Sequence, residues 1–262
     1  MTAARTFKGL LFDLDGVLYV DSRAIAGAGD AVRRIKDRGI RCRFLTNTST
    51  LTLASLHRKV QGFGLPIEPH EIISAPQAAL RYLQRQGGGA CCLLLADDVR
   101  CDFAQLRQVE IEQAEDIVLG DIGAAFTYEL LNRVFRRLMQ GSRLIAIHKN
   151  RYWETECGLR MDIGGFVAAL EYATGREALV MGKPSPDFFR VALLDMGLEA
   201  ADVAVIGDDI DSDVGGGQRA GVYGILVRTG KYRQAYVETS AVRPDCVVDS
   251  VADLPRLLES PS

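Results

Sequence analysis

The sequence predicts an α/β protein built around a parallel β-sheet. Short apolar runs of strand length alternate along the chain with longer segments whose apolar residues recur at helical spacing. The apolar runs are continuous, which is typical of strands that helices cover on both faces. Polar residues follow several of these runs directly, and ligands bind at this edge of open α/β sheets.

The first part of the chain begins this alternation. The run at residues 8–13 (KGLLFD) predicts a buried strand. A helix is expected at residues 28–38, where apolar residues share one face before a glycine. The pattern then repeats, with a strand at residues 40–45 and a helix at residues 51–63.

The last third of the chain shows the same order of elements. Its expected strands and helices are strands 178–181, 203–206 and 223–227 and helices 186–196 and 212–220. Because this order matches that of the first part of the chain, both ends are expected to build one sheet.

The middle of the chain has a βα rhythm of its own and is interpreted as an inserted α/β domain. Its expected elements are strands 90–95, 116–119 and 144–147 and helices 128–139 and 166–173. The insert is predicted to span residues 77–179. Residues 1–76 and 180–262 then form one discontinuous domain.

Composition limits the classes of function. The chain has 31 Lys and Arg against 34 Asp and Glu, a net charge of −3, which does not favour a nucleic-acid-binding protein. The longest apolar runs are far shorter than the roughly 18 residues of a membrane span, and the N-terminus lacks an apolar signal core. The six cysteines show no metal-binding spacing and are interpreted as buried apolar residues in a reducing compartment. We therefore expect a cytoplasmic protein with no membrane and no nucleic-acid partner.

Four polar segments follow predicted strands of the sheet that both ends of the chain build. They are Asp13-Leu14-Asp15, Thr46-Asn47, Gly182-Lys183-Pro184, and Gly207-Asp208-Asp209 with Asp213 downstream. Each has an ordinary interpretation on its own, as a turn aspartate, a helix cap or a solvated lysine. Three acids within six residues repel one another unless a cation is present. Their coincidence at the strand ends of one sheet favours a functional site.

The residue types at these strand ends suit phosphoryl transfer. Asp13 and Asp208 offer the hard oxygen ligands that Mg²⁺ prefers. Lys183 supplies a compact positive charge, and Thr46 supplies a hydroxyl donor for a phosphate oxygen. Phosphoryl transfer depends chiefly on positioning and charge neutralisation, which these groups provide.

The two aspartates of the first segment can divide the chemistry between them. A carboxylate at Asp13 can attack phosphorus and form an aspartyl-phosphate. Asp15, two residues on, can protonate the leaving group and then take a proton from water. This division requires an ionised Asp13 and an Asp15 that carries a proton when the leaving group departs.

The four segments resemble the four motifs of the haloacid dehalogenase (HAD) superfamily, in the same order along the chain. The resemblance implies a Rossmann-like core, with Asp13 as nucleophile and Asp15 as general acid and base. It implies that Mg²⁺ is bound by Asp13, Asp208 and the backbone carbonyl of Asp15, with Asp213 orienting the metal site. The residues implied to bind phosphate are Thr46, Asn47 and Lys183.

The same resemblance narrows the class of enzyme. Within the superfamily, an aspartate at the position of Asp15 is typical of phosphatases and phosphomutases. An insert of this size between the second and third motifs resembles the C2-type cap of the NagD-type phosphatases, whereas mutases usually carry a small helical cap earlier in the chain. The resemblance thus implies a Mg²⁺-dependent phosphatase with a C2-type cap at residues 77–179. Members of this subfamily often dimerise through the cap, so a homodimer is expected.

A narrower resemblance to one branch of this subfamily lies in residues 144–149, 166–174 and 224–232. It implies a small phosphate monoester, phosphoramidate or pyrophosphate as substrate. Residues 97–115 match that branch less well and lie in the cap, so a nucleotide or sugar phosphate remains the alternative. A non-catalytic regulator that binds phosphorylated ligands is disfavoured, because Asp13, Lys183 and Asp208 are all present.

The insert also contains one cluster of aromatic and basic residues. Its members are His148, Lys149, Arg151, Tyr152 and Trp153. The cluster either recognises the leaving group, by charge and by stacking on the indole, or forms a solvated loop with a half-buried indole. The second interpretation is the favoured one.

Overall fold

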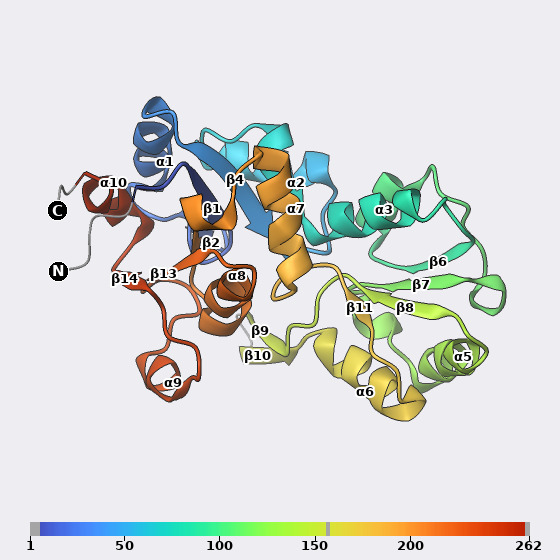
Figure 1. The fold of residues 1–262 in the computed structure, drawn as a ribbon. Helices are drawn as coiled ribbons and strands as arrows, with labels where there is room; N and C mark the ends of the chain where they lie inside the picture. The colour runs from blue at the N-terminus through green and yellow to red at the C-terminus, as the bar shows by residue number, and fades with distance from the viewer. Residues whose placement is uncertain (1–5, 156–157, 260–262) are drawn as a thin grey trace. The chain divides into compact units, whose positions relative to one another are not determined.

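The computed structural model describes residues 6–155 and 158–259 (Figure 1). The chain forms two compact units. The first comprises Met1–Thr46, Ser55–Ile73 and Pro184–Ser262, and the second comprises Asn47–Ala54 and Ser74–Lys183. The insert expected at residues 77–179 falls inside the second unit, and its role as a cap stays a prediction.

A six-stranded sheet organises the first unit. Its strands lie in the order β14-β13-β12-β1-β4-β5, and the four pairs from β14 to β4 are parallel. The strands are β1 (Gly9–Asp13), β4 (Arg41–Thr46), β5 (Ile72–Ser74), β12 (Val203–Gly207), β13 (Tyr223–Val227) and β14 (Cys246–Val248). Strands from both ends of the chain share this sheet, which confirms the predicted parallel α/β fold.

Continuous apolar sequence explains the central strands. Every residue of β1 and β12 is buried, as expected for strands that are covered on both faces. Phe12 of β1 stacks on Phe44 of β4, with ring centroids 5.4 Å apart. This packing holds the carboxyl ends of neighbouring strands in fixed positions.

Helices and a short hairpin accompany this sheet. They are α1 (Ala28–Asp37), α2 (Leu53–Gly62), α7 (Pro186–Met196), α8 (Gly216–Arg219), α9 (Gln234–Thr239), α10 (Leu254–Leu257), β2 (Tyr19–Val20) and β3 (Arg23–Ala24). Helix α1 buries Ala31, Val32 and Ile35 along one face. The helix expected at residues 212–220 differs in form, because Ile210–Gly215 makes a wider, π-helical turn before α8.

A four-stranded parallel sheet organises the second unit, in the order β11-β8-β7-β6. Its strands are β6 (Cys91–Leu94), β7 (Asp116–Leu119), β8 (Arg143–Ala146) and β11 (Leu179–Val180). The helices and an antiparallel hairpin are α3 (Ala75–Arg85), α4 (Asp97–Arg100), α5 (Tyr128–Met139), α6 (Gly164–Thr174), β9 (Tyr152–Thr155) and β10 (Gly158–Met161). Across the described parts of both units, no helix has the length and apolar character needed to cross a lipid bilayer.

Two segments belong to a different unit than the sequence pattern suggests. The strand expected at residues 178–181 for the core sheet is β11, which pairs with β8 of the second unit. Residues 47–54 also belong to the second unit, because the amides of Thr52 and Leu53 donate to Asp98 and Asp102. Both differences arise from hydrogen bonds between residues far apart in the sequence.

Candidate active site

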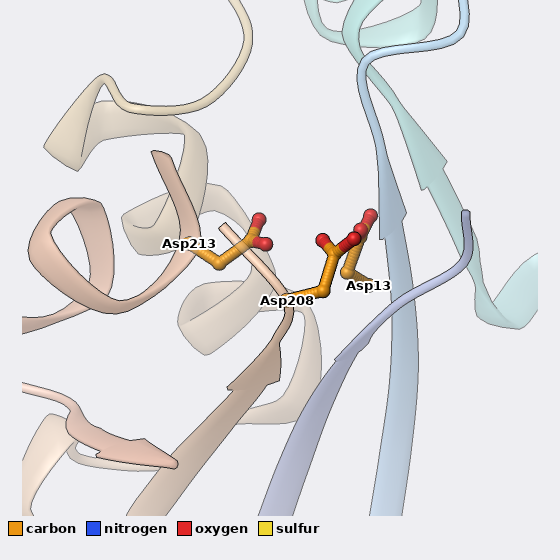
Figure 2. Close-up of side chains that lie close together, drawn as sticks. All are labelled: Asp13, Asp208 and Asp213. Atoms are coloured by element: carbon orange, nitrogen blue, oxygen red, sulfur yellow. The ribbon is translucent and has the colours of Figure 1, made fainter. Parts of the chain in front are cut away.

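Three buried carboxylates meet at the carboxyl edge of the first unit's sheet (Figure 2). Asp13 ends β1, Asp208 follows the adjacent strand β12, and Asp213 lies in the turn after it. One carboxylate oxygen of each residue lies within 4.8 Å of the others. The structure thus brings together three of the residues that the sequence predicts for the metal site.

The environment of Asp208 favours binding of a cation. Asp208 is 2% exposed, and its pKa is raised well above the usual value by burial and then by the charges of Asp13 and Asp213. Its Oδ2 accepts a hydrogen bond from the Lys231 amide at 2.7 Å. Its Oδ1 has no hydrogen-bond partner among the described residues. A buried oxygen facing two other carboxylates is costly without a partner, and a divalent cation would satisfy it.

Two glycines allow the chain to close around Asp208. Gly16 and Gly230 have φ values of 86° and 57°, which favour glycine. A Cβ at Gly16 would lie 1.8 Å from Asp208 Oδ2, and one at Gly230 would lie 2.0 Å from it. The Thr229 hydroxyl donates to the Gly16 carbonyl at 2.5 Å and joins the two loops. Glycine at both positions therefore leaves room for the Asp208 carboxylate.

The turn at Ile210–Gly215 places Asp213. Asp209 Oδ1 accepts from the amides of Asp211 and Ser212 at 3.1 and 3.0 Å, so Asp209 caps the turn. The Asp209 amide in turn donates to Asp213 Oδ2 at 3.2 Å. Asp209 therefore has a structural role at this turn.

Asp15 lies in a different environment from Asp13. Its side chain is 48% exposed, whereas Asp13 is buried. The Tyr19 hydroxyl donates to Asp15 Oδ2 at 3.0 Å, and Lys59 Nζ lies 4.0 Å from Asp15 Oδ1. Burial, the charge of Asp15 and this hydrogen bond all raise the pKa of Tyr19, so the phenol keeps its proton and stays a donor. The two aspartates thus lie in different environments, and their predicted division of roles stays a prediction.

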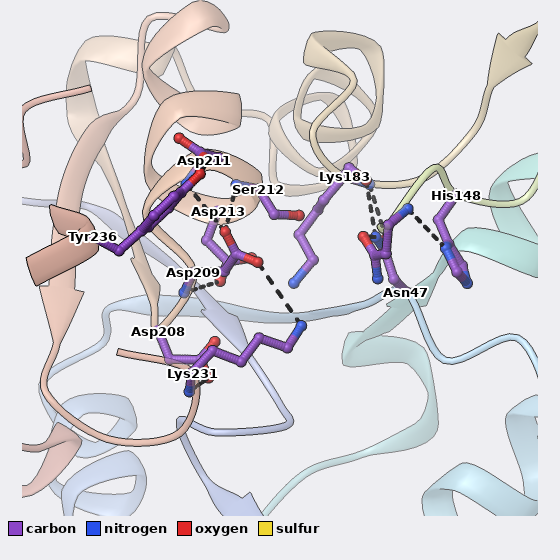
Figure 3. Close-up of polar contacts among 11 residues, drawn as sticks. Asn47, His148, Lys183, Asp208, Asp209, Asp211, Ser212, Asp213, Lys231 and Tyr236 are labelled. Carbon is purple, nitrogen blue, oxygen red and sulfur yellow. Dashed lines mark hydrogen bonds and ion pairs between the residues drawn. The ribbon is translucent and has the colours of Figure 1, made fainter. Parts of the chain in front are cut away.

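Asn47 holds the main chain of Lys183 within the second unit (Figure 3). The Lys183 amide donates to Asn47 Oδ1 at 2.9 Å, and Asn47 Nδ2 donates to the Lys183 carbonyl at 2.8 Å. Asn47 Nδ2 also lies 3.2 Å from Asn150 Oδ1. A Cβ at Gly182 would lie 2.4 Å from Asn47 Oδ1, so glycine is needed for this approach. Asn47 is thus a positioning residue for Lys183, and phosphate binding by Asn47 stays a prediction.

Replacing Asn47 by alanine is expected to lower the free energy of unfolding by about 1–3 kcal/mol, because the hydrogen bonds to Lys183 and Asn150 are lost. Asn47→Asp keeps the acceptor but places a carboxylate oxygen against the Lys183 carbonyl and Asn150 Oδ1, so it is expected to destabilise the protein at least as much as alanine. Urea denaturation of the full chain measures the change. A variant that loses phosphate affinity with unchanged stability would instead indicate a direct phosphate ligand.

Thr46 and Lys183 occupy buried positions in the units to which they belong. Thr46 ends β4 beside Asp13's strand in the first unit, and Lys183 closes the second unit at its junction with Pro184. Each lies directly next to a unit boundary in the chain. Their predicted contacts with phosphate stay predictions.

Lys231 is a charged residue near the carboxylates to which the sequence assigned no role. Its Nζ lies 3.9 Å from Asp209 Oδ2 (Figure 3). Burial lowers its pKa, but the charges of Asp208, Asp209, Asp13 and Asp213 more than offset this and raise it overall. Its position after β13 is a strand end of the same sheet, which is the signal that would have found it.

The members of the aromatic and basic cluster that the structure describes do not share one environment. His148 is buried, with Nε2 3.4 Å from Ser49 Oγ and 3.9 Å from Asp162 Oδ1. Lys149 pairs with Glu171, whereas Tyr152 is half exposed. The Trp153 side chain lies outside the described residues, so the expectations for its indole stay predictions. His148 is a packed, hydrogen-bonded residue and not part of a solvated loop.

Comparison with known proteins identifies the family. Residues 10–110 match the family model described as haloacid dehalogenase-like hydrolase, and residues 180–254 match the one described as HAD-hydrolase-like. The human phospholysine phosphohistidine inorganic pyrophosphate phosphatase is 39% identical over 257 residues, which cover 96% of this chain and 94% of the relative. The bovine haloacid dehalogenase-like hydrolase domain-containing protein 2 is 40% identical over 235 residues, which cover 90% of this chain and 89% of the relative. The chain belongs to the haloacid dehalogenase-like hydrolases.

Solved structures narrow the group. The p-nitrophenyl phosphatase from Archaeoglobus fulgidus is 31% identical, with a TM-score of 0.89 over 96% of this chain and 99% of that one. NagD from Escherichia coli K-12 shares the fold, with a TM-score of 0.84 and 24% identity over 95% of this chain and 98% of that one. Within the family, the chain is a phosphatase that shares the fold of NagD. This confirms the predicted family and class of enzyme.

Proposed function

We propose that this chain is a Mg²⁺-dependent phosphatase that acts on a small phosphorylated substrate through a covalent phospho-Asp13 intermediate. The observation that carries the proposal is the buried cluster of Asp13, Asp208 and Asp213. Family membership supports hydrolysis of a phosphate bond as the reaction. The cluster supports a cation that is bound beside Asp13 and assists this reaction.

The donor set fits a small divalent cation. All three side chains offer carboxylate oxygens, the ligand type that Mg²⁺ prefers, and Asp208 Oδ1 has no hydrogen-bond partner among the described residues. Asp13, Asp208 and the backbone carbonyl of Asp15 would hold the ion, and Asp213 would orient the site. A bound Mg²⁺ would supply positive charge that offsets the repulsion between Asp13 and an incoming phosphate.

The reaction is proposed to take two steps at Asp13. In the first, a carboxylate oxygen of Asp13 bonds to phosphorus, the bond from phosphorus to the leaving group breaks, and Asp15 gives its proton to the leaving group. In the second, Asp15 takes a proton from water, the water oxygen bonds to phosphorus, and the bond from phosphorus to Asp13 breaks. Phosphate leaves, and both carboxyl groups return to their initial states.

Thr46 and Lys183 are proposed to hold the transferring phosphate. The resemblance assigns them this role, and their burial supports side chains with restricted orientation. The Asn47 amide fixes the Lys183 main chain at both its N–H and its carbonyl, which supports a lysine placed for a specific contact.

The proposed substrate class is a phosphoramidate, a pyrophosphate or a small phosphate monoester. The name of the human relative, a phospholysine phosphohistidine inorganic pyrophosphate phosphatase, supports the first two. That of the archaeal p-nitrophenyl phosphatase supports a monoester. A nucleotide or a sugar phosphate is the alternative.

Phosphate release from a substrate panel tests the proposal. The panel contains p-nitrophenyl phosphate, pyrophosphate, phospholysine, a nucleoside monophosphate and phosphoglycolate, each with Mg²⁺ and with EDTA. Phosphate release is expected to require Mg²⁺, and the substrate that is hydrolysed fastest identifies the substrate class. Release that is equal in EDTA would contradict the metal requirement, and binding of a phosphate mimic without release would indicate a regulator.

Asp208→Asn is expected to stabilise the metal-free protein at pH 8 by about 2–4 °C, the shift that about 1 kcal/mol gives in a large domain. Folding raises the pKa of Asp208, so the ionised carboxylate destabilises the folded protein. This cost is absent below the pKa of the unfolded chain, and it is present in full once the pH has risen through the pKa of the folded state. The melting-temperature difference between variant and wild type in EDTA should therefore shrink as the pH falls towards 5.

Mg²⁺ provides the matched control for this change. Wild-type protein is expected to melt at a higher temperature with Mg²⁺ than with EDTA, whereas Asp208→Asn loses most of this difference. Differential scanning calorimetry at pH 8 and at pH 5 measures the melting temperatures of wild type and Asp208→Asn, each with Mg²⁺ and with EDTA. An unaltered Mg²⁺ shift in the variant would contradict Asp208 as a ligand.

The homodimer through residues 77–179 and the cytoplasmic location are also proposed. Resemblance to the NagD-type subfamily supports the dimer, and the composition of the chain supports the location. Sedimentation velocity tests the first, since a single monomeric species at micromolar concentration would contradict it. Fractionation of source cells tests the second.

A further inference from the structure

Lys231 is held rigidly beside the carboxylate cluster by its main chain. Its amide donates to Asp208 Oδ2 at 2.7 Å, and the loop before it is tied to Gly16 by the Thr229 hydroxyl at 2.5 Å. The Arg228 amide donates to the Val248 carbonyl at 3.0 Å at the start of the same loop. The Cα of Lys231 therefore has little freedom.

The side chain of Lys231, by contrast, makes no short ion pair among the described residues. It is 49% exposed, and its Nζ lies 3.9 Å from Asp209 Oδ2. An ion pair this long and this exposed adds little to stability. Asp209 already has its own structural hydrogen bonds to Asp211 and Ser212, so the turn does not need the lysine. The ammonium group is held in no short ion pair with the described residues and can therefore also contact an anion.

The order of the strands places this ammonium on one side of the cluster. Lys231 follows β13, Asp208 follows β12, Asp13 ends β1, and Thr46 ends β4, and these strands are neighbours in that order. The loop that carries Lys231 and the residue proposed to bind phosphate, Thr46, therefore flank the carboxylates from opposite sides. Two anionic groups can therefore bind along this edge of the sheet, one near Thr46 and one near Lys231.

We propose that the Lys231 ammonium binds a second anionic group of the substrate, one that is not transferred, such as the leaving phosphate of pyrophosphate. This inference rests on the proposed function, in which Asp13 receives the first phosphoryl group. A leaving group with its own negative charge is repelled by the carboxylates unless a nearby cation offsets that charge, and Lys231 is a cation of the loop after β13 that lies beside them. The substrate class is therefore a phosphate compound with a second anionic group next to the cleaved bond.

Binding of a diphosphonate tests this inference without catalysis. Methylenediphosphonate carries two phosphonate groups on a P–C–P link that resists hydrolysis, and inorganic phosphate carries a single group. Calorimetry in Mg²⁺ compares both ligands with wild type, Lys231→Met, Lys231→Arg and Lys8→Met. Lys8 is an exposed lysine of the same unit paired with Asp202, and it serves as the charge-matched control.

The affinity ratio of diphosphonate to phosphate is expected to fall about 10–100-fold in Lys231→Met, the loss typical of one charged hydrogen bond. Lys231→Arg should retain most of the ratio, and Lys8→Met should retain all of it. An unchanged ratio in Lys231→Met would overturn the inference. An equal loss for both ligands would also overturn it, because Lys231 would then act through Asp208.

Turnover separates this inference from the proposed function. Wild-type protein that binds diphosphonate through Lys231 but releases phosphate from no substrate would contradict the phosphatase proposal alone. Wild-type protein that hydrolyses pyrophosphate, with an affinity ratio unchanged in Lys231→Met, would contradict the role of Lys231 alone.

Discussion

Replacing Asp13 by asparagine is expected to reduce kcat by about 10⁴-fold or more, the scale seen when a catalytic nucleophile is removed. An amide is a poor nucleophile towards phosphorus and a weaker ligand for a hard cation than a carboxylate. Asparagine has nearly the same shape, and Asp13 is buried at the end of a fully buried strand, so the fold should be retained. Steady-state phosphate release with the best substrate of the panel measures the effect.

The control for this variant is an aspartate of the same unit far from the cluster. Asp30 lies in the first turn of α1, is 78% exposed and pairs with Arg33. Asp30→Asn should leave kcat unchanged. Circular dichroism should show the same secondary structure in both variants and in wild type. An Asp13→Asn protein that keeps a tenth of the wild-type kcat would exclude Asp13 as the nucleophile.

Replacing Asp15 by asparagine is expected to slow the two steps of the reaction unequally. With a basic leaving group, the first step should slow by about 10²–10⁴-fold, the usual contribution of a general acid. With p-nitrophenyl phosphate, whose leaving group needs no proton, the first step should be nearly retained. The second step should slow for both substrates, because the same carboxyl group takes a proton from water.

Stopped-flow absorbance distinguishes these outcomes. The Asp15→Asn protein should release one equivalent of p-nitrophenolate in a burst and then turn over slowly. Tyr19→Phe is the matched control, because it removes the hydroxyl that donates to Asp15 and leaves the carboxyl group in place. Its effect should be smaller, on the order of 10-fold. An equal slowing of the first step for activated and unactivated substrates would argue against a general-acid role.

The sequence predicted the central sheet and its functional edge well, because both depend on local patterns. Continuous apolar runs such as Leu10-Leu11-Phe12 are typical of strands buried on both faces, and the structure buries every residue of β1. The parallel order then brings Asp13 and Asp208 together, since they end adjacent strands. A polar residue directly after such a run was therefore enough to locate the carboxylate cluster.

Features that depend on long-range pairing were not predictable from local patterns. Strand β11 has the same apolar character as the core strands, and only its hydrogen bonds to β8 place it in the second unit. The Asn47 side chain bonds to the main chain of Lys183, 136 residues away, and no spacing in the sequence indicates this contact. The role proposed for the Lys231 ammonium depends on the carboxylates near it, which come from distant parts of the sequence.

Rapid-quench mapping of the phosphoryl group tests the central claim most directly. Wild-type and Asp15→Asn protein are mixed with isotopically labelled substrate and Mg²⁺, quenched in acid at successive times, and digested for peptide mapping. The label is expected on Asp13 before free phosphate appears, and it should accumulate in the Asp15→Asn protein because its release is slowed. Phosphate release at the normal rate with no label on Asp13 at any time would contradict the proposed mechanism.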